Sequence, residues 1–223
     1  MKLRLGAAPA WFLAILVVVV AASVLGMNTP VRRAGTATVT LGPDSGEQVD
    51  AYVARTAATA PTSGGPYWAL VSLRAELSPA AVAELPGQAR LARVIFRVPI
   101  ENVQTAQLPV DVVDQGDLAH ELAASEVAAG SRLQQLTDAR TDRAASVGAV
   151  SASRLRAGCA CVLALVVRGS AEQLRTIAGH PEVRAVEVTP ADSAARGVSV
   201  SALLPEQTTV VQPSPDDGAV PAR

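Results

Sequence analysis

The sequence predicts an α+β domain in which two βαβ units share one four-stranded sheet. Residues 161–190, CVLALVVRGSAEQLRTIAGHPEVRAVEVTP, follow the order strand, helix, strand, and residues 67–99 show the same order earlier in the chain. In each unit a continuously apolar strand comes first and a more polar strand returns. We therefore expect the apolar strands at the centre, the polar strands at the edges and two helices on one face.

The second unit has the clearer signals. Residues 162–167 form a six-residue apolar run rich in β-branched valine, which indicates a strand covered on both faces. Ser170 and Gln173 have the spacing of a capping box, so a helix begins there. Gly179 ends that helix. Residues 183–188 then form the returning strand, and its two charged positions predict that it is less buried than the first strand.

The first unit follows the same rules. Residues 67–73 are apolar apart from one serine and predict a covered strand. Ser78 followed by Pro79 is a helix cap with proline at the first helical position, and Gly87 lies where that helix ends. Residues 91–98 alternate in polarity, which is typical of a strand with one wet face.

Between the two units, a polar connection over residues 100–116 precedes a predicted long helix over 117–145. Asp117 is a suitable cap, and leucines follow at approximate helical spacing, although Gly130 costs about 1 kcal/mol relative to alanine. The two βαβ units together form a ferredoxin-like arrangement, which normally has only a tight turn at this point, so the helix is an insertion. We expect it to cover the otherwise exposed sheet face; the alternative is a docking or self-association helix.

Residues 1–27 form the predicted membrane segment. Residues 6–27 carry no charge over 22 positions, enough to span a bilayer, and Trp11 lies where an interfacial aromatic is expected. An uncleaved transmembrane anchor is favoured, and a cleaved signal peptide is the alternative because small residues occupy positions 21–26. Either way, we expect the domain outside the cytoplasm, in a single-pass membrane protein or, after cleavage, a secreted one.

The flanking segments are rich in Gly, Pro, Ser and Thr. Residues 28–66 are predicted to be a juxtamembrane spacer with a short strand at 37–41 and a short helix at 48–57. Residues 191–223 form a proline-containing tail, in which 198–204 pack locally and the remainder is largely disordered.

Composition argues against nucleic-acid binding. The chain has 223 residues with 19 basic and 20 acidic side chains, and aromatic residues make up only 3%. No dense basic run occurs, and aromatic side chains are too few for base stacking. We therefore expect no nucleic-acid partner.

Cys159 and Cys161 are the only cysteines. In an oxidising compartment two cysteines predict a disulfide. Residues two apart on an extended strand have Cα atoms about 6.5–7 Å apart, the upper edge of disulfide geometry, so a bridge needs a bend that Gly158 can provide. A structural role is the default, and a redox role is the alternative.

No other catalytic or metal signature is present. A metal site needs three or four ligands, and Cys159, Cys161, His120 and His180 have no ligand-like spacing. There is no G-x-S-x-G elbow, H-E-x-x-H motif or phosphate-binding loop. We therefore expect no cofactor and no catalytic residues.

Residues 161–190 carry one family resemblance. The apolar strand, the segment SAEQL at 170–174 and above all HPEVRAVE at 180–187 resemble the second half of the propeptide-like inhibitor family of subtilisin-type proteases. The resemblance implies a ferredoxin-like fold and a protein that chaperones or inhibits a protease by laying its sheet and C-terminal tail against it. The first unit matches only in its order of elements, and the helical insertion is foreign to that family.

Together these observations predict a non-enzymatic, membrane-anchored extracytoplasmic module that acts through protein–protein contacts. Its expected partners are another membrane or envelope protein, or a second copy of itself, and the bilayer through the N-terminal helix. One alternative is a protease inhibitor or chaperone, and another is a thiol-redox or hydrolytic enzyme.

Overall fold

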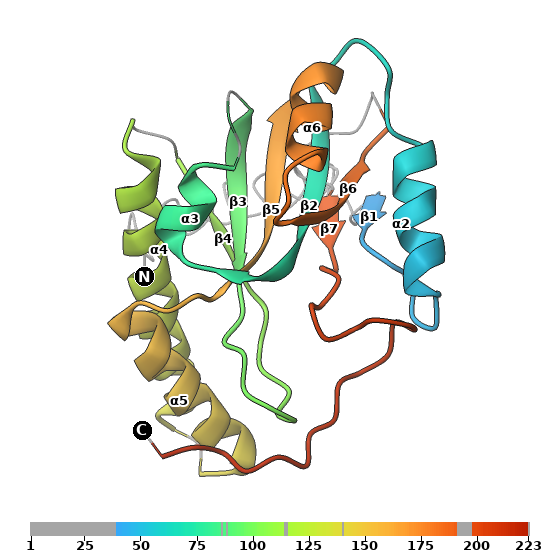
Figure 1. Ribbon diagram of the computed structural model, residues 1–223. Coiled ribbons are helices and arrows are strands. Elements are labelled where there is room, and N and C mark those ends of the chain that lie inside the picture. The colour runs from blue at the N-terminus through green and yellow to red at the C-terminus, as the bar shows by residue number, and fades with distance from the viewer. Residues whose placement is uncertain are drawn as a thin grey trace, which may run out of the picture. The chain divides into compact units, whose positions relative to one another are not determined.

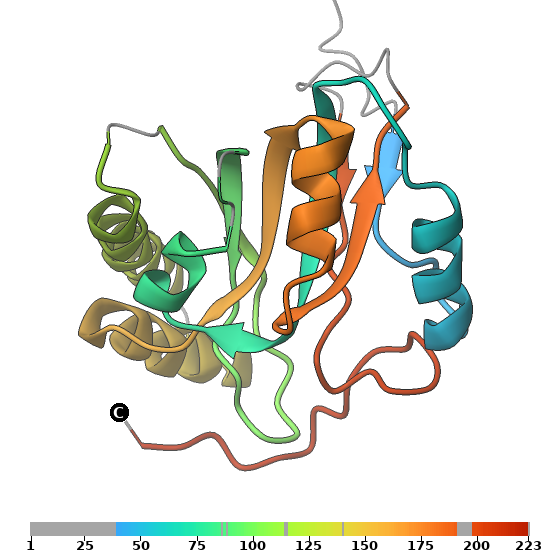
Figure 2. The same cartoon turned by 45° about the horizontal axis from the view of Figure 1, so that its top comes forward.

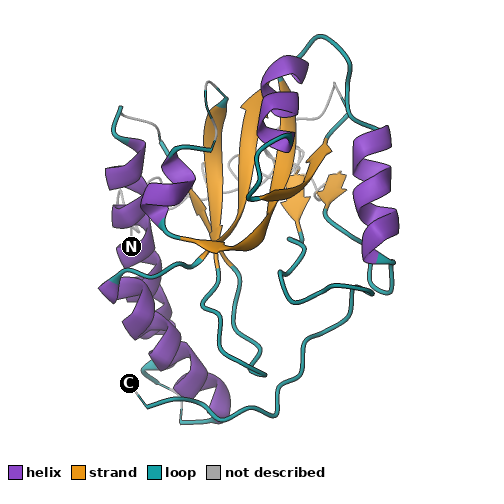
Figure 3. Cartoon of the chain, viewed as in Figure 1, coloured by secondary structure: helices purple, strands orange, loops and turns teal. Residues whose placement is uncertain are grey.

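The computed structural model describes residues 39–85, 87, 89–113, 116–139, 141–190 and 198–222, which belong to one compact unit. The predicted α+β class is confirmed: helices pack on an antiparallel sheet of five strands in the part of the chain that is described (Figures 1 and 3). The predicted membrane segment at 1–27 lies outside these residues. Within them, no helix has the length and apolarity needed to cross a bilayer.

The main sheet has the strand order β4-β3-β5-β2-β6, and every neighbouring pair is antiparallel. Its strands are β2 (Tyr67–Leu77), β3 (Arg90–Phe96), β4 (Leu108–Asp111), β5 (Val162–Gly169) and β6 (Val183–Val188). The two continuously apolar strands, β2 and β5, are neighbours, and β6 lies at one edge. Central strands are covered on both faces, which is why these two have no polar alternation.

The expectation of four strands is wrong, because β4 adds a fifth within the segment predicted to be a polar connection. Leu108 and Val110 pack against the core, whereas Asp111 is exposed and pairs with Arg93 on β3 at 2.7 Å. Four alternating residues containing Pro109 give a weak strand signal, and pairing with β3 decides the conformation.

Helices α3 (Pro79–Ala83) and α6 (Ala171–Ala178) pack on one face of the sheet, α4 (Leu118–Thr137) contacts α3, β3 and β4, and α5 (Arg143–Ala157) packs on α4; all four contribute to one core. Figure 2 shows α3 and α6 in front of the strands. The predicted caps are confirmed, since Ser78 accepts from the Ala81 N–H and Ser170 forms the full capping box with Gln173.

The single helix predicted over 117–145 is instead two antiparallel helices, α4 and α5. The chain leaves α4 at Asp138, and Asp142 begins α5 by accepting a hydrogen bond from the Ala145 N–H at 2.9 Å. Aspartate favours such a cap because its carboxylate satisfies a backbone N–H that has no partner within the helix. The short connection makes the pair an αα-hairpin.

The hairpin does not cover the opposite face of the sheet, so that expectation is also wrong. Leu122 of α4 and Leu155 of α5 belong to the same core as α3 and α6. The opposite face packs instead against β1 (Val39–Leu41), which pairs in parallel with β7 (Val198–Val200), and against Ala202. Segments from both flanks of the domain therefore complete its second core.

The flanking segments are more ordered than composition predicts. The short strand and helix predicted at 37–41 and 48–57 are confirmed as β1 and α2 (Val49–Ala58), and α2 packs against β6. Leu203 is fully buried, and residues 205–218 lie along the domain although we expected disorder. Strand β6 is less buried than β5, as predicted, although Glu187 itself is only 7% exposed.

Gly130→Ala should destabilise the protein, although alanine is about 1 kcal/mol more favourable than glycine inside a helix. A Cβ at Gly130 would lie 2.9 Å from the Ala152 carbonyl oxygen and 3.0 Å from the Leu155 Cβ, so α4 and α5 must separate. Overpacking of this kind costs about 1–3 kcal/mol, which gives a net loss of about 1 kcal/mol. Urea unfolding measures it. Gly179→Ala, whose Cβ would meet nothing closer than 3.5 Å, is the control, and equal stability of the two variants would contradict the close helix packing.

Candidate functional site at Cys159 and Cys161

Cys159 and Cys161 lie in the link between α5 and β5 and form a disulfide. Their Cα atoms are 5.2 Å apart, well inside the usual range, because the chain bends rather than extends here. Gly158 has φ 80°, a conformation that glycine adopts without steric cost. Gly158 therefore provides the bend that a disulfide between Cys159 and Cys161 needs.

The two sulfur-bearing residues differ in exposure. Cys161 is 1% exposed and belongs to the core, whereas Cys159 is partly buried and is flanked by exposed Gly158 and Ala160. Cys159 is therefore the more exposed residue of the bridge, although it also packs against the main core.

Glu126 of α4 faces the disulfide. Its side chain is 1% exposed, and its Oε1 lies 3.1 Å from the Cys159 backbone nitrogen, which donates a hydrogen bond to it. The same oxygen is 3.1 Å from the Cys159 Sγ. A bonded sulfur has no proton, so this second approach is a van der Waals contact that reduction would convert into a hydrogen bond.

The helical hairpin places Glu126 there. Gly130 lets α4 approach α5 at Leu155, and one helical turn before Gly130 the chain reaches Glu126, while four residues after Leu155 it reaches Cys159. The antiparallel direction of the two helices therefore brings residues 33 positions apart into contact. Close helix packing is what positions the carboxyl group.

Burial raises the pKa of the Glu126 carboxyl above its ordinary value, and the hydrogen bond from the Cys159 N–H lowers it by a smaller amount. A carboxyl group with a raised pKa exchanges protons closer to neutral pH than an exposed one does. The site therefore places a proton donor and acceptor in contact with the sulfur of the more exposed cysteine.

Sequence reasoning missed Glu126. The available signal was its position: Glu126 falls one turn after Leu122 and one turn before Gly130, on the buried face of the helix. An acidic residue on an apolar helix face is unusual unless it has a partner. The partner is 33 residues away, so spacing alone could not identify it.

The structure does not bring the histidines into this site. Glu126, Cys159 and Cys161 are the described residues whose ligand atoms gather within 4.8 Å of one another. The His120 backbone nitrogen donates to the Asp117 cap, and the His180 Nδ1 accepts from the Glu182 N–H in a turn. Both histidines have ordinary structural explanations.

Glu126→Gln should change the pH dependence of stability. The wild-type carboxyl has a raised pKa in the folded state, so its contribution is fully present below the unfolded value and is lost as pH rises through the folded pKa. The variant should therefore gain stability relative to wild type as the pH rises above about 4, the ordinary value of an unfolded glutamate, measured as urea midpoints. The exposed Glu101→Gln change serves as control; a Glu126→Gln difference that stays constant with pH would contradict burial of a titrating group.

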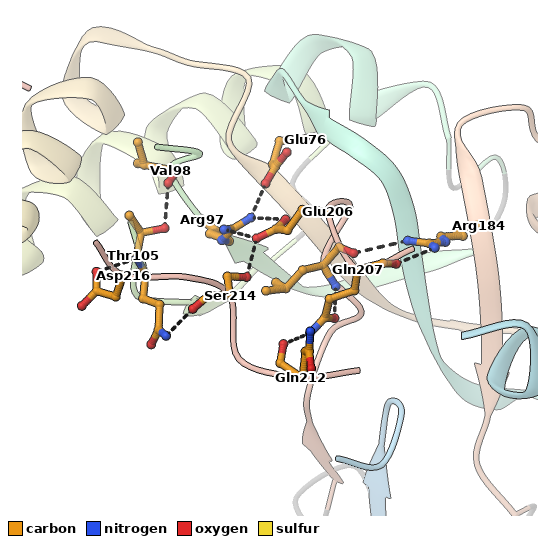
Figure 4. A network of polar contacts seen from close by, with 12 residues as sticks. Glu76, Arg97, Val98, Thr105, Arg184, Glu206, Gln207, Gln212, Ser214 and Asp216 are labelled. Carbon is orange, nitrogen blue, oxygen red and sulfur yellow. Dashed lines mark hydrogen bonds and ion pairs between the residues drawn. The ribbon is translucent and has the colours of Figure 1, made fainter. Parts of the chain in front are cut away.

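A second polar cluster forms where residues 205–218 cross the domain. We call this segment the C-terminal strap. Arg97 is 5% exposed and donates to Glu76 at 2.9 Å and to both carboxylate oxygens of Glu206 in the strap at 2.9 and 2.5 Å (Figure 4). Ser214 also donates to Glu206. Burial alone would raise the pKa of Glu206, but its own backbone N–H and Arg97 outweigh burial and lower it.

The strap is attached at further points and lines a pocket that is open to solvent. Arg184 donates to the backbone carbonyls of Leu204 and Gln207, and Gln104 binds the Ser214 carbonyl (Figure 4). A cavity of about 660 Å³ lies between the strap, Arg97 and residues 99–103. Because the strap is held mainly by polar contacts, it is the part of this surface that can move with least loss of buried apolar area.

Comparison of the chain with protein-family models, curated proteins and solved structures gives no match. The resemblance of residues 161–190 to the propeptide-like inhibitors stays a prediction based on the local sequence. The function must therefore be argued from the geometry described above.

Proposed function

We propose that this domain exchanges thiols and disulfides with another protein of the cell envelope through Cys159 and Cys161. One observation carries the proposal: a disulfide between a partly buried and a fully buried cysteine contacts a buried carboxyl group at 3.1 Å. A disulfide that serves only to tie the chain needs no buried acid beside it, and burying a carboxyl group that accepts one backbone hydrogen bond is costly.

The exchange balances as a two-electron transfer. A partner thiolate attacks the Cys159 sulfur, forming a mixed disulfide while the Cys161 sulfur leaves and takes up a proton. A second partner thiolate then attacks the partner sulfur of that mixed disulfide, which releases Cys159. The partner gains a disulfide, and this domain becomes a dithiol with two protons added.

Glu126 supplies the proton at the atom that it contacts. A neutral carboxyl group 3.1 Å from the Cys159 sulfur can protonate that sulfur as it leaves. In the reverse direction the carboxylate takes the proton from the Cys159 thiol and yields the thiolate, which is the reactive form. Burial, which raises the pKa of Glu126 above its ordinary value, favours the neutral form that donates this proton.

The exported location belongs to the same proposal. Stable disulfides form in oxidising compartments, and the bonded cysteines favour a domain outside the cytoplasm. The uncharged residues 6–27 would anchor it to the membrane as a single-pass protein. The expected partner is then another envelope protein with a thiol or disulfide near its surface.

We also propose that β2, β3, β5 and β6 form a ferredoxin-like core. The order β3-β5-β2-β6 with α3 and α6 on one face supports this assignment. The protease-inhibitor alternative needs a free sheet face and a free C-terminal tail. Here β1 and β7 cover that face, and the C-terminal strap is bound to Arg97. This geometry argues against a protease inhibitor.

Mixed-disulfide trapping tests the exchange. In cells producing the full chain with Cys161→Ser, the remaining Cys159 should form stable mixed disulfides with envelope proteins, seen as reducible bands of higher mass. Cys159→Ser is the matched control and should capture far less, because its remaining cysteine is buried. Equal capture by both variants, or none by either, would count against the proposal.

A non-enzymatic contact module is the second candidate, favoured by the cavity under the C-terminal strap. In this function the domain binds an envelope protein and exchanges no disulfide with it. A pull-down with the full chain carrying both Cys159→Ser and Cys161→Ser distinguishes the two candidates. Retention of the same partners without cysteines would favour contact alone, whereas loss of all partners would favour exchange.

A further inference from the structure

We infer that the reduced site binds one zinc-like divalent cation through Cys159, Cys161 and Glu126. The inference rests on the proposed function in one respect, that the cysteines can be reduced in the folded protein. It goes beyond that function, since the ligand is a metal ion and the binding state is the dithiol.

The ligand atoms are already gathered. The sulfur atoms and a Glu126 carboxylate oxygen lie within 4.8 Å of one another. Ligand atoms around one tetrahedral zinc are about 3.5 Å apart, because zinc–sulfur and zinc–oxygen bonds are about 2.3 and 2.1 Å long. Once reduction removes the bond between the sulfurs, small side-chain rotations can meet this geometry.

The surroundings suit a bound ion. Glu126 is fixed on α4, Cys161 directly precedes β5, and each is 1% exposed, so two ligands are held in place away from water. Cys159 lies between exposed Gly158 and Ala160, nearer to solvent. Three protein ligands are the number found in zinc sites that keep the fourth position for water or another molecule.

The ligand types select the cation. Two thiolates and one carboxylate carry three negative charges in a buried site, which a divalent cation offsets better than a monovalent one. Magnesium and calcium prefer sites made only of oxygen, so thiolates disfavour them. Zinc accepts both sulfur and oxygen ligands.

Zinc and the disulfide are mutually exclusive states of the same atoms. A dithiol reductant donates two electrons and two protons to the disulfide, and zinc then displaces the protons from both thiols. Bound zinc holds the sulfurs as metal ligands, so they are withdrawn from exchange. Metal availability would thereby control how much of the reduced protein can react.

Zinc titration of the full chain, purified in detergent, tests the inference. After reduction with a phosphine and its removal without oxygen, thiols are counted with a chromogenic disulfide, and zinc is titrated against a coloured chelator. The expected result is two thiols and one zinc per chain. Zinc should be absent from the oxidised wild type, which keeps the fold, and Glu126→Gln should bind about tenfold or more weakly.

The other outcomes separate the two claims. Two accessible thiols without stoichiometric zinc binding would overturn the metal site alone and leave thiol exchange standing. Equal zinc affinity of Glu126→Gln and wild type, or equal binding by oxidised protein, would also overturn it. Thiols that stay inaccessible to reduction in the folded chain would overturn both claims together.

Discussion

Arg97→Met is expected to lower the free energy of unfolding by about 3 kcal/mol, since removing one member of a buried ion pair leaves an uncompensated charge. Methionine keeps much of the apolar stem but cannot pair with Glu76 or Glu206. The Glu76 side chain is 11% exposed and loses its cation in a poorly solvated place, whereas Glu206 is 40% exposed and recovers part of its hydration. The expected loss therefore lies at the lower end of the range for buried pairs.

Urea unfolding and limited proteolysis measure this change. The C-terminal strap should be cleaved earlier in Arg97→Met than in wild type, because Glu206 no longer holds it. Asp111→Ala removes the exposed partner of Arg93 and should cost less than about 1 kcal/mol, which makes it the matched ion-pair control. Wild-type stability of Arg97→Met, with an equally protected strap, would refute the role assigned to this arginine.

Glu187→Ala is expected to cost about 2–4 kcal/mol, because it removes the acceptor shared by the Gly42 N–H and the buried Tyr52 hydroxyl, and each unsatisfied donor costs about 1–3 kcal/mol. The Glu187 carboxylate accepts hydrogen bonds from Arg55 at 2.9 Å, from the Tyr52 hydroxyl at 3.3 Å and from the Gly42 N–H. Tyr52 is fully buried, and burial and the negative charge of Glu187 both raise its pKa, so its hydroxyl stays neutral and donates. Alanine would leave the Gly42 N–H and the Tyr52 hydroxyl without this acceptor, whereas Arg55 keeps its ion pair with Glu47.

Urea unfolding again gives the measurement, together with hydrogen exchange of the α2 amides. Loss of Glu187 should accelerate exchange in α2, because α2 packs against β6 beside this network. Glu47→Ala removes the other carboxylate bound to Arg55, lies outside the core and should cost about 1 kcal/mol. Equal stability of Glu187→Ala and Glu47→Ala would contradict the larger contribution that we assign to Glu187.

The sequence predicts correctly those helices that are stabilised by their own capping residues and those strands that are buried along their whole length. The apolar strand β5 and the capped helix α6 follow from a valine-rich run and from Ser170 with Gln173. The sequence did not predict the strand β4 and the separate helix α5, for two different reasons. The first is too short to show alternation, and the second is rich in alanine and serine, so its buried face has little apolar contrast.

Long-range contacts determine the parts that composition predicted wrongly. The C-terminal strap is polar and proline-containing, which predicts disorder, yet Arg97 gives Glu206 a buried partner 109 residues away. The site shows the same limit. Cys159, Cys161 and the bend at Gly158 are visible in the sequence, whereas the contact with Glu126 depends on how closely two helices pack.

The rate at which the disulfide reacts with glutathione, in folded and in urea-unfolded protein, tests the central claim most directly. If the fold activates Cys159, native protein should react faster than the unfolded chain, and Glu126→Gln should slow the native reaction without changing the unfolded one. A native disulfide that reacts more slowly than the unfolded one, with or without Glu126, would show that the bridge only ties the chain at the start of β5.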